Sequence, residues 1–365
     1  MNPFLNLSIK LYLPIGTAVC LGIALSWLLS HPWVQQRSDR SWHRIVPGYM
    51  GKFLFLIGVP IGVVNFIRKA DLSGIVFLAP VVAWCSILLG ILCAWLWLRN
   101  FQEWTITSKG SFTLVSMVGN TGYLGFPVIL LLPQLGPDYF GWAVLYDVLG
   151  TFFGAYGLGV ILAAQWNRQA QNQAQHHQHK LNPVTTDSND RMSAGFSEEA
   201  VDSNRVAVPL NPLASFGRIT KEVLKNPTLF AFIVGLGLRS VIFPEWLDRG
   251  VSLFAWGVIM LSLVLMGIRL QQLDSWQSLK SAFPAVVIKM FLVPLLVAMV
   301  LTSVGIEGPP RLVLILQSAM PSAFATLVLA ETYNLDRELV VTSLGLSSAL
   351  LLFMLPFWLW GFATW

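Results

Sequence analysis

Charged residues are scarce in this chain of 365 residues, where only 11% are Asp, Glu, Lys or Arg and 55% are hydrophobic. A soluble domain carries roughly 25% charged residues, so the composition excludes a water-soluble globular protein and predicts one embedded in a lipid bilayer. The formal net charge is +5. The basic residues lie between apolar runs, as membrane topology requires, and this placement argues against a nucleic-acid partner.

Cysteine is also rare, and the signatures of common catalytic sites are missing. Cys20, Cys85 and Cys93 fall in apolar segments without metal-ligand spacing. The chain has no Gly-x-Ser-x-Gly, no His-Glu-x-x-His, no phosphate-binding loop and no dinucleotide fingerprint. We therefore expect no enzyme activity, no cofactor, no metal site and no nucleotide-driven pump.

What the sequence does contain is ten apolar segments, each near the roughly 20 residues that one membrane crossing needs. They predict an all-α polytopic membrane protein, with one five-helix repeat in residues 1–165 and another in 221–365. The segments lie near residues 11–30, 45–67, 74–98, 111–132, 139–165, 227–243, 250–270, 282–303, 311–330 and 338–362.

The polar stretch 166–220 separates the two predicted repeats and includes a Gln/Asn/His-rich run. Such composition favours a flexible linker. Three of its residues, His176, His177 and His179, form a possible metal cluster, but the surrounding Gln-rich low complexity favours a solvated tether.

Lys and Arg in the connections predict the orientation. With ten spans, one side of the membrane collects most of these residues, including those of the linker, and that side is expected to be cytoplasmic. We therefore predict a multi-pass protein of the plasma (inner) membrane, with both termini outside and residues 166–220 in the cytoplasm.

Two repeats with an odd number of spans have opposite orientations, which is the inverted-repeat architecture of many secondary transporters. Proline positions agree with it, because Pro14 and Pro32 bound the first span as Pro227 and Pro244 bound the sixth. In addition, helices four and nine are both predicted to break at their middle, the first in Val118 to Pro127 and the second in Gln317 to Ser322. Such matched breaks indicate a binding site at the midplane.

The two predicted breaks supply the candidate substrate-binding residues. Half-helix N-termini with free N–H groups favour an anion, and a carboxylate is the natural substrate group. The alternative is that the glycines only allow close helix packing and the prolines only kink the helices. The candidates are Gly119, Asn120, Thr121, Gly122, Gly125 and Pro127 in the first break and Gln317, Ser318, Pro321 and Ser322 in the second.

Four further polar residues inside predicted spans are candidates for coupling or charge tuning, because such residues are costly in a bilayer. Asp147 and Lys289 lie in spans five and eight, where they either pair with each other or carry a proton during transport. Lys52 and Asn65 lie in span two. A helix-end anchor or a buried structural contact is the alternative role for each of the four.

These motifs resemble those of the auxin efflux carrier family of membrane transporters. The resemblance rests on Gly119 to Pro127, on Ala319 to Tyr333, on Asn226-Pro227 and on Leu263 to Leu270, and it covers all ten spans. It implies a scaffold of spans 1, 2, 6 and 7 and a moving part of spans 3–5 and 8–10, with an organic anion held where helices four and nine cross. The chain has Gly150-Thr151 where the family pattern leads us to expect amides, so substrate identity is not carried over.

The leading hypothesis is an alternating-access transporter for a small organic anion, such as an auxin-like compound or a mono- or dicarboxylate. One alternative is a sodium- or proton-coupled symporter or antiporter of similar fold, in which Asn120 or Gln317 and backbone carbonyls bind the cation. Another is a membrane receptor or scaffold without transport. A homodimer is also possible.

Overall fold

The computed structural model describes residues 12–31, 42–100, 104–181, 227–271 and 278–362, and within these ranges every regular element is a helix. The elements of the first half are α2 (Leu13–Ser30), α4 (Trp42–Phe53), η2 (Leu54–Gly58), α5 (Val59–Lys69), α6 (Leu78–Arg99), α7 (Ile106–Met117), η3 (Thr121–Gly125), α8 (Phe126–Leu131), α9 (Phe140–Tyr146), η4 (Asp147–Thr151), η5 (Gly154–Gly159) and α10 (Val160–Leu181). The second half contains α12 (Pro227–Gly237), η6 (Leu238–Ser240), α13 (Glu245–Gln271), α14 (Leu279–Val287), η7 (Ile288–Leu292), α15 (Val293–Ser303), α16 (Gly308–Ser318), α17 (Phe324–Thr332) and α18 (Arg337–Phe362).

Seven helices in the described part of the chain are long and apolar enough to cross a membrane, and two shorter apolar helices cover residues 121–131 and 227–240. The prediction of an all-helical, multi-pass protein is therefore confirmed. Each of the ten apolar segments read from the sequence coincides with one helix or with a run of consecutive helices.

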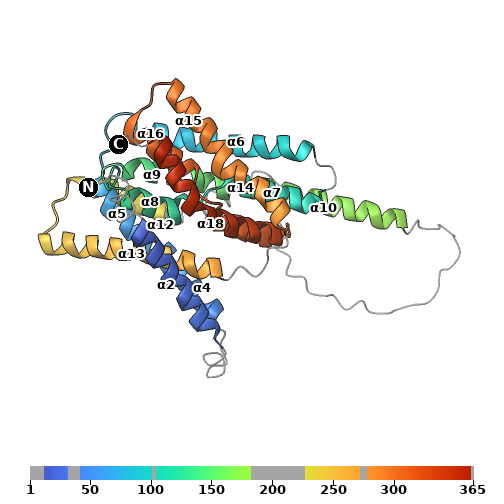
Figure 1. Ribbon diagram of the computed structural model, residues 1–365, viewed down its shortest axis with the longest axis horizontal. Coiled ribbons are helices and arrows are strands. Elements are labelled where there is room, and N and C mark those ends of the chain that lie inside the picture. The colour runs from blue at the N-terminus through green and yellow to red at the C-terminus, as the bar shows by residue number, and fades with distance from the viewer. Residues whose placement is uncertain (1–11, 32–41, 101–103, 182–226, 272–277, 363–365) are drawn as a thin grey trace, which may run out of the picture.

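The first residues of the predicted linker, from residue 166 onwards, are helical. Helix α10 continues through the Gln-rich run to Leu181 and extends beyond the other helices (Figure 1). Ala, Gln and Arg are good helix formers, so a polar composition did not prevent the helix from continuing. The rest of the linker, residues 182–220, and the side chains of the three histidines lie outside the part that the structure describes.

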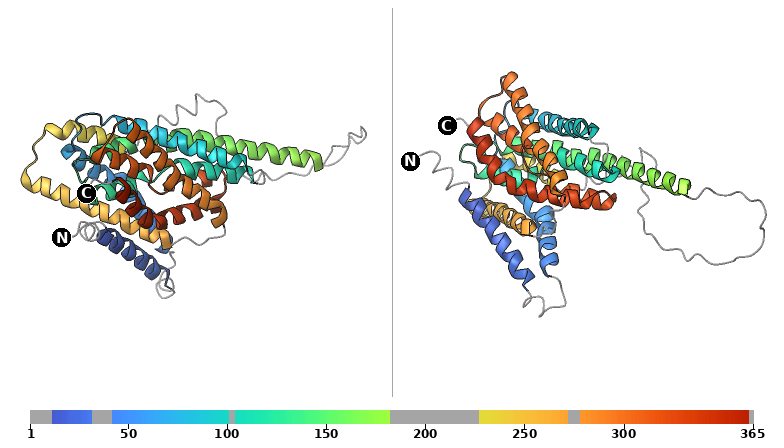
Figure 2. Two further views of the ribbon diagram at one scale, coloured as in Figure 1. Left: turned by 45° about the horizontal axis from the view of Figure 1, so that its top comes forward. Right: turned by 45° about the vertical axis from the view of Figure 1, so that its right-hand side comes forward.

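The helices form two groups. The first consists of α2, α4, α5, α12 and α13, in which α2 packs along α13 and α5 along α12 (Figure 2). Gly22 and Gly267 bring α2 and α13 into backbone contact, because a Cβ on either would lie 2.1 Å from a carbonyl oxygen of the other helix. The second group consists of the helices from α6 to α10 and from α14 to α18.

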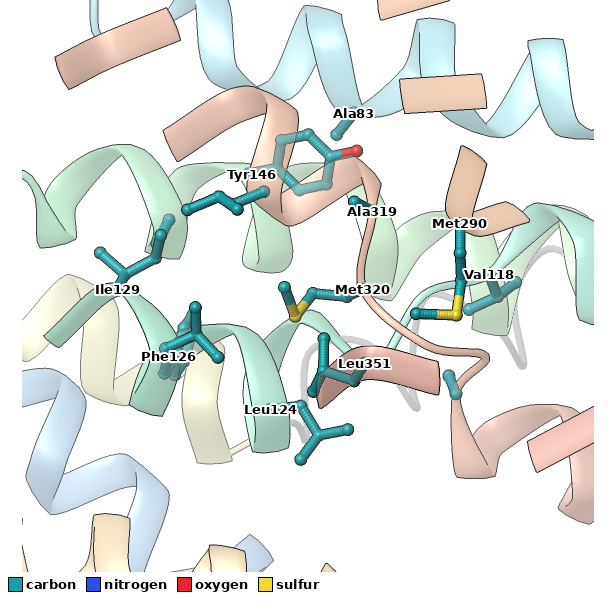
Figure 3. Close-up of a cluster of buried hydrophobic side chains, with 14 of the residues drawn as sticks. Ala83, Val118, Leu124, Phe126, Ile129, Tyr146, Met290, Ala319, Met320 and Leu351 are labelled. Carbon is teal, nitrogen blue, oxygen red and sulfur yellow. The ribbon is translucent and has the colours of Figure 1, made fainter. Parts of the chain in front are cut away.

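An apolar core surrounds the place where the chain breaks in α7–α8 and in α16–α17. Figure 3 shows Met320 of the second break among apolar side chains that include Leu124, Phe126 and Leu351. Met320 and Leu124 are at most 1% exposed. Apolar side chains therefore pack closely around Met320 in the second break.

Candidate functional site

Both predicted helix interruptions are present. Helix α7 ends at Met117, and Val118 is extended with φ −105° and ψ 121° before η3 begins at Thr121. Glycines disfavour helix here. Helix α16 ends at Ser318, and α17 begins after Ala323, because Pro321 lacks an N–H group and restricts the residue before it.

The two breaks lie against each other and pair through their backbones. The Asn120 N–H donates to the Pro321 carbonyl at 2.6 Å, and the Ala323 N–H donates to the Val118 carbonyl at 3.0 Å. Gly119 and Ser322 thus form an antiparallel bridge. This exchange satisfies backbone groups that leave the helices, as a low-dielectric environment demands. We call this pairing of residues 118–120 with 321–323 the crossing.

Serine hydroxyls also hold the crossing together. The Ser322 hydroxyl donates to the Val115 carbonyl at 3.0 Å, and its N–H donates to the Ser347 hydroxyl at 3.3 Å. The Ser318 hydroxyl donates to the Ile315 carbonyl in its own helix. Both serines are at most 1% exposed, so the side chains of these two predicted substrate ligands point into the protein interior.

A cavity of about 650 Å³ lies on one side of the crossing, between the two groups of helices. The first break and the start of α17 both border it, together with residues of α4, η2, η4 and α12. The lining residues that are polar, or that belong to the crossing or to the helix starts after it, are Lys52, Val118, Gly119, Asn120, Thr121, Gly122, Tyr123, Asp147, Thr151, Tyr156, Thr228, Ala323, Phe324 and Ala325.

Two helix N-termini border this cavity. Residues 121–131 form one apolar helical run, and the Asn120 carbonyl already accepts from the N–H groups of Leu124 and Gly125. The N–H groups of residues 121–123 therefore have no acceptor within their own helix, and the same holds for the first residues of α17. Each N-terminus carries a partial positive charge, so the cavity wall suits an anion.

Asp147 borders the same cavity as the first residue of η4. Its carboxylate accepts a hydrogen bond from the Thr121 hydroxyl. A Cβ on Gly122 would lie 3.3 Å from the carboxylate, so Gly122 leaves room for this approach. Lys52 is exposed at the edge of the cavity and is the basic residue of its lining.

Lys289 lies at the crossing but outside the lining of this cavity. It is 2% exposed, and its Nζ donates to the Ser318 carbonyl at 2.9 Å. In the described part of the chain, no ion pair joins it to Asp147. The pairing suggested as one possibility by the sequence is therefore not formed, because each of the two charges has its own partner in the breaks.

The other sequence candidates lie away from the cavity. Gln317 is fully buried against Gly125, where an added Cβ would come within 2.3 Å of its Oε1, and neither amide atom has a hydrogen-bond partner among the described residues. Pro127 borders a separate void of about 30 Å³. Asn65 accepts from the Ser252 hydroxyl at 3.2 Å near the end of α5.

Sequence reasoning missed several cavity residues. Tyr123 stands inside the first motif, so its position in the break was an available signal. Thr151 was noted only as a departure from the family pattern, yet it lines the cavity, while Gly150 beside it packs against Ala83. No sequence pattern indicated Tyr156 or Thr228.

A second, larger cavity of about 1160 Å³ lies between α6 and α15. Its side chains are apolar except for Glu307. Its lining has no basic side chain, whereas Lys52 borders the cavity at the crossing, so the cavity at the crossing is the better candidate site for an anion.

Comparisons with known proteins identify the family of this chain. A family model described as "Membrane transport protein" matches residues 49–359. An uncharacterized transporter of Methanocaldococcus jannaschii is 26% identical over 282 residues, which is 77% of each chain. An uncharacterized transporter of Methanothermobacter thermautotrophicus is 24% identical over 317 residues, 85% of this chain and 87% of the relative. The chain therefore belongs to the membrane transport protein family, the auxin efflux carrier family that its motifs resemble.

Proposed function

We propose that this transporter moves a small organic anion across the plasma membrane by alternating access, and that the anion binds in the cavity at the crossing. One observation carries the proposal: helix N-termini from the two halves of the chain, at Thr121 and Phe324, border the same cavity. Helix N-termini bind anions through free N–H groups and the helix dipole.

The binding mode follows from the polar groups of the wall. A carboxylate accepts from the first N–H groups of η3 and of α17, and the Asn120 amide adds a side-chain donor. Lys52 at the edge attracts the anion from solution. The apolar lining, including Phe55 and Phe324, suits the organic part of an auxin-like compound or of a mono- or dicarboxylate.

Alternating access requires a part that moves against a scaffold, and two inverted repeats supply such parts. The contacts support this arrangement, because they recur with the two halves exchanged. Helix α2 packs on α13 as α12 packs on α5, and α9 packs on α16 as α18 packs on α7. We propose ten spans in two repeats, with the first helix group as scaffold and the second as the moving part.

Proton coupling is a second candidate, and one observation favours it over sodium coupling. Asp147 borders the cavity beside the N-terminus that we assign to the substrate. An ionised carboxylate there repels an incoming anion. Protonation of Asp147 removes this repulsion, so a proton is expected to accompany the anion.

The proposal is tested with purified protein in liposomes and radiolabelled succinate, malonate and indole-3-acetate. We expect uptake of at least one of these carboxylates. Asn120→Ala removes one hydrogen bond to a charged group, worth about 1.5–3 kcal/mol. The substrate concentration that gives half-maximal uptake should therefore rise about tenfold or more. Asn100→Ala, at the exposed end of α6, is the matched control.

Two results would contradict the proposal. One is the absence of uptake of every carboxylate tested by protein shown to be folded. The other is equal half-saturation in wild type and Asn120→Ala, which would remove the crossing from the binding site.

A further inference from the structure

Lys289 is a lysine in the interior of a membrane-embedded helix pair. It lies on η7, between α14 and α15, and its side chain reaches the crossing. A Cβ on Gly119 would lie 3.1 Å from its Nζ, so the ammonium group rests directly on the backbone of the first break. The ammonium donates to the Ser318 carbonyl at 2.9 Å.

That position is where two helices end. Helix α7 ends at Met117 and α16 ends at Ser318, and a helix C-terminus carries a partial negative charge. In transporters with broken helices, half-helix C-termini and unwound carbonyls hold the coupling cation. In this chain the ammonium of Lys289 lies at this place.

Neighbouring carbonyls already have other donors. The Val115 carbonyl accepts from the Ser322 hydroxyl, and the Gln317 carbonyl accepts from the Met320 N–H at 3.4 Å. Among the residues that the structure describes, the carbonyl of Ser318 is the acceptor assigned to Lys289. The ammonium thus donates to a carbonyl at the C-terminus of α16 that the helix itself leaves without a partner.

The charge balance points the same way. None of the ion pairs found among the described residues includes Lys289, and Asp147 accepts from Thr121 on the cavity side of the break. A buried ammonium without a carboxylate is costly. Here the two converging helix C-termini supply the compensating negative potential.

We infer that the Lys289 ammonium is a built-in cation that takes the place of a mobile sodium ion, so that the transporter works without sodium. The statement about transport rests on the proposed function. The fixed cation at the helix ends does not, and its stability consequences are measured without any substrate.

The test compares thermal unfolding of the purified full chain in NaCl and in choline chloride at equal ionic strength. Wild type should unfold at the same temperature in both salts, because the cation position is filled. Lys289→Ser removes the charge and opens space beside the Ser318 carbonyl. In choline chloride its unfolding temperature should be several degrees lower than that of the wild type, and NaCl should restore part of this difference.

Two further variants serve as controls. Lys280→Ser removes the same charge from an exposed position outside the cavity. This variant should unfold at the wild-type temperature in both salts. Lys289→Met keeps most of the side-chain volume without the charge, so it should lose stability and leave no space for sodium to restore it.

The inference is overturned if sodium stabilises the wild type, or if sodium gives Lys289→Ser no more stability than choline does. If Lys289→Ser does not fold, the wild-type comparison and the loss of stability in Lys289→Met decide. In liposomes, succinate, malonate and indole-3-acetate uptake by wild type should be equal in sodium and potassium buffers. Absence of all uptake would refute the proposed function while leaving the unfolding result to decide on Lys289.

Discussion

Gly125→Ala should disturb the contact that holds the first break against α16. The Cβ of the new alanine would lie 2.3 Å from Oε1 of Gln317 and 3.0 Å from its Cδ and Nε2. Gln317 is fully buried, so its amide cannot swing into solvent. The side chain or one of the two helices must therefore shift.

The magnitude follows from two opposing effects. Overpacking a well-packed core costs about 1–3 kcal/mol, and a 2.3 Å approach favours the upper half of that range. Replacing glycine by alanine in a helix returns up to ~1 kcal/mol. We therefore expect the free energy of unfolding to fall by about 1–2 kcal/mol.

The assay is denaturant unfolding in mixed micelles, with Gly157→Ala as the matched control. A Cβ on Gly157 meets no atom within 4 Å, so that variant should be neutral or slightly more stable. Combining Gly125→Ala with Gln317→Ala should recover about 1 kcal/mol relative to additivity, as expected for residues in contact. The described packing would be refuted if Gly125→Ala were as stable as the wild type. It would also be refuted if the double variant showed the plain sum of the two single effects on the free energy of unfolding.

Two further predictions concern charges. Arg68→Ala should lower the free energy of unfolding by about 1–2 kcal/mol, because this buried guanidinium pairs with Asp248. Arg249→Ala removes a highly exposed ion pair and should change the free energy of unfolding by less than about 0.5 kcal/mol. Equal effects of the two variants in denaturant unfolding would contradict this prediction. Asp147→Asn should abolish the acceleration of carboxylate uptake by an inward proton gradient. A variant at an exposed position, Asp138→Asn, should retain this acceleration. If the gradient accelerates uptake by Asp147→Asn as strongly as uptake by the wild type, Asp147 is excluded as the proton carrier.

The helices and their breaks were predictable because hydropathy and helix propensity are local. Runs of about 20 apolar residues identify membrane helices, and the cluster of glycines at residues 119–125 and the proline at 321 mark interruptions. Helix α10 was not predictable in full. Its Gln-rich end looks like a linker by composition, but a helix already started propagates into residues that nucleate poorly.

Site residues were predictable only in part, because a motif does not say which way each side chain points. Asn120, Thr121 and Gly122 border the cavity, whereas Gly125 and Gln317 pack against each other behind it. The serines of the second break bond backbone carbonyls. The cavity side of that break is made by residues 323–325, whose main-chain groups leave no side-chain signature.

The partners of the two buried charges also depend on tertiary structure. The presence of Asp147 and Lys289 in apolar segments marks them as special, but periodicity does not tell which helix faces which. In the structure Asp147 meets a helix N-terminus and Lys289 meets a helix C-terminus. Each charge thus faces the helix end of opposite sign.

The central claim is that helix N-termini from both halves of the chain hold the anion at the crossing. It is tested most directly by an experimental structure of the protein in lipid nanodiscs with a saturating concentration of the carboxylate that is transported best. The account predicts carboxylate density within hydrogen-bonding distance of the N–H groups of residues 121–123 and 324–325. Density only in the apolar cavity between α6 and α15, with the crossing empty, would contradict it.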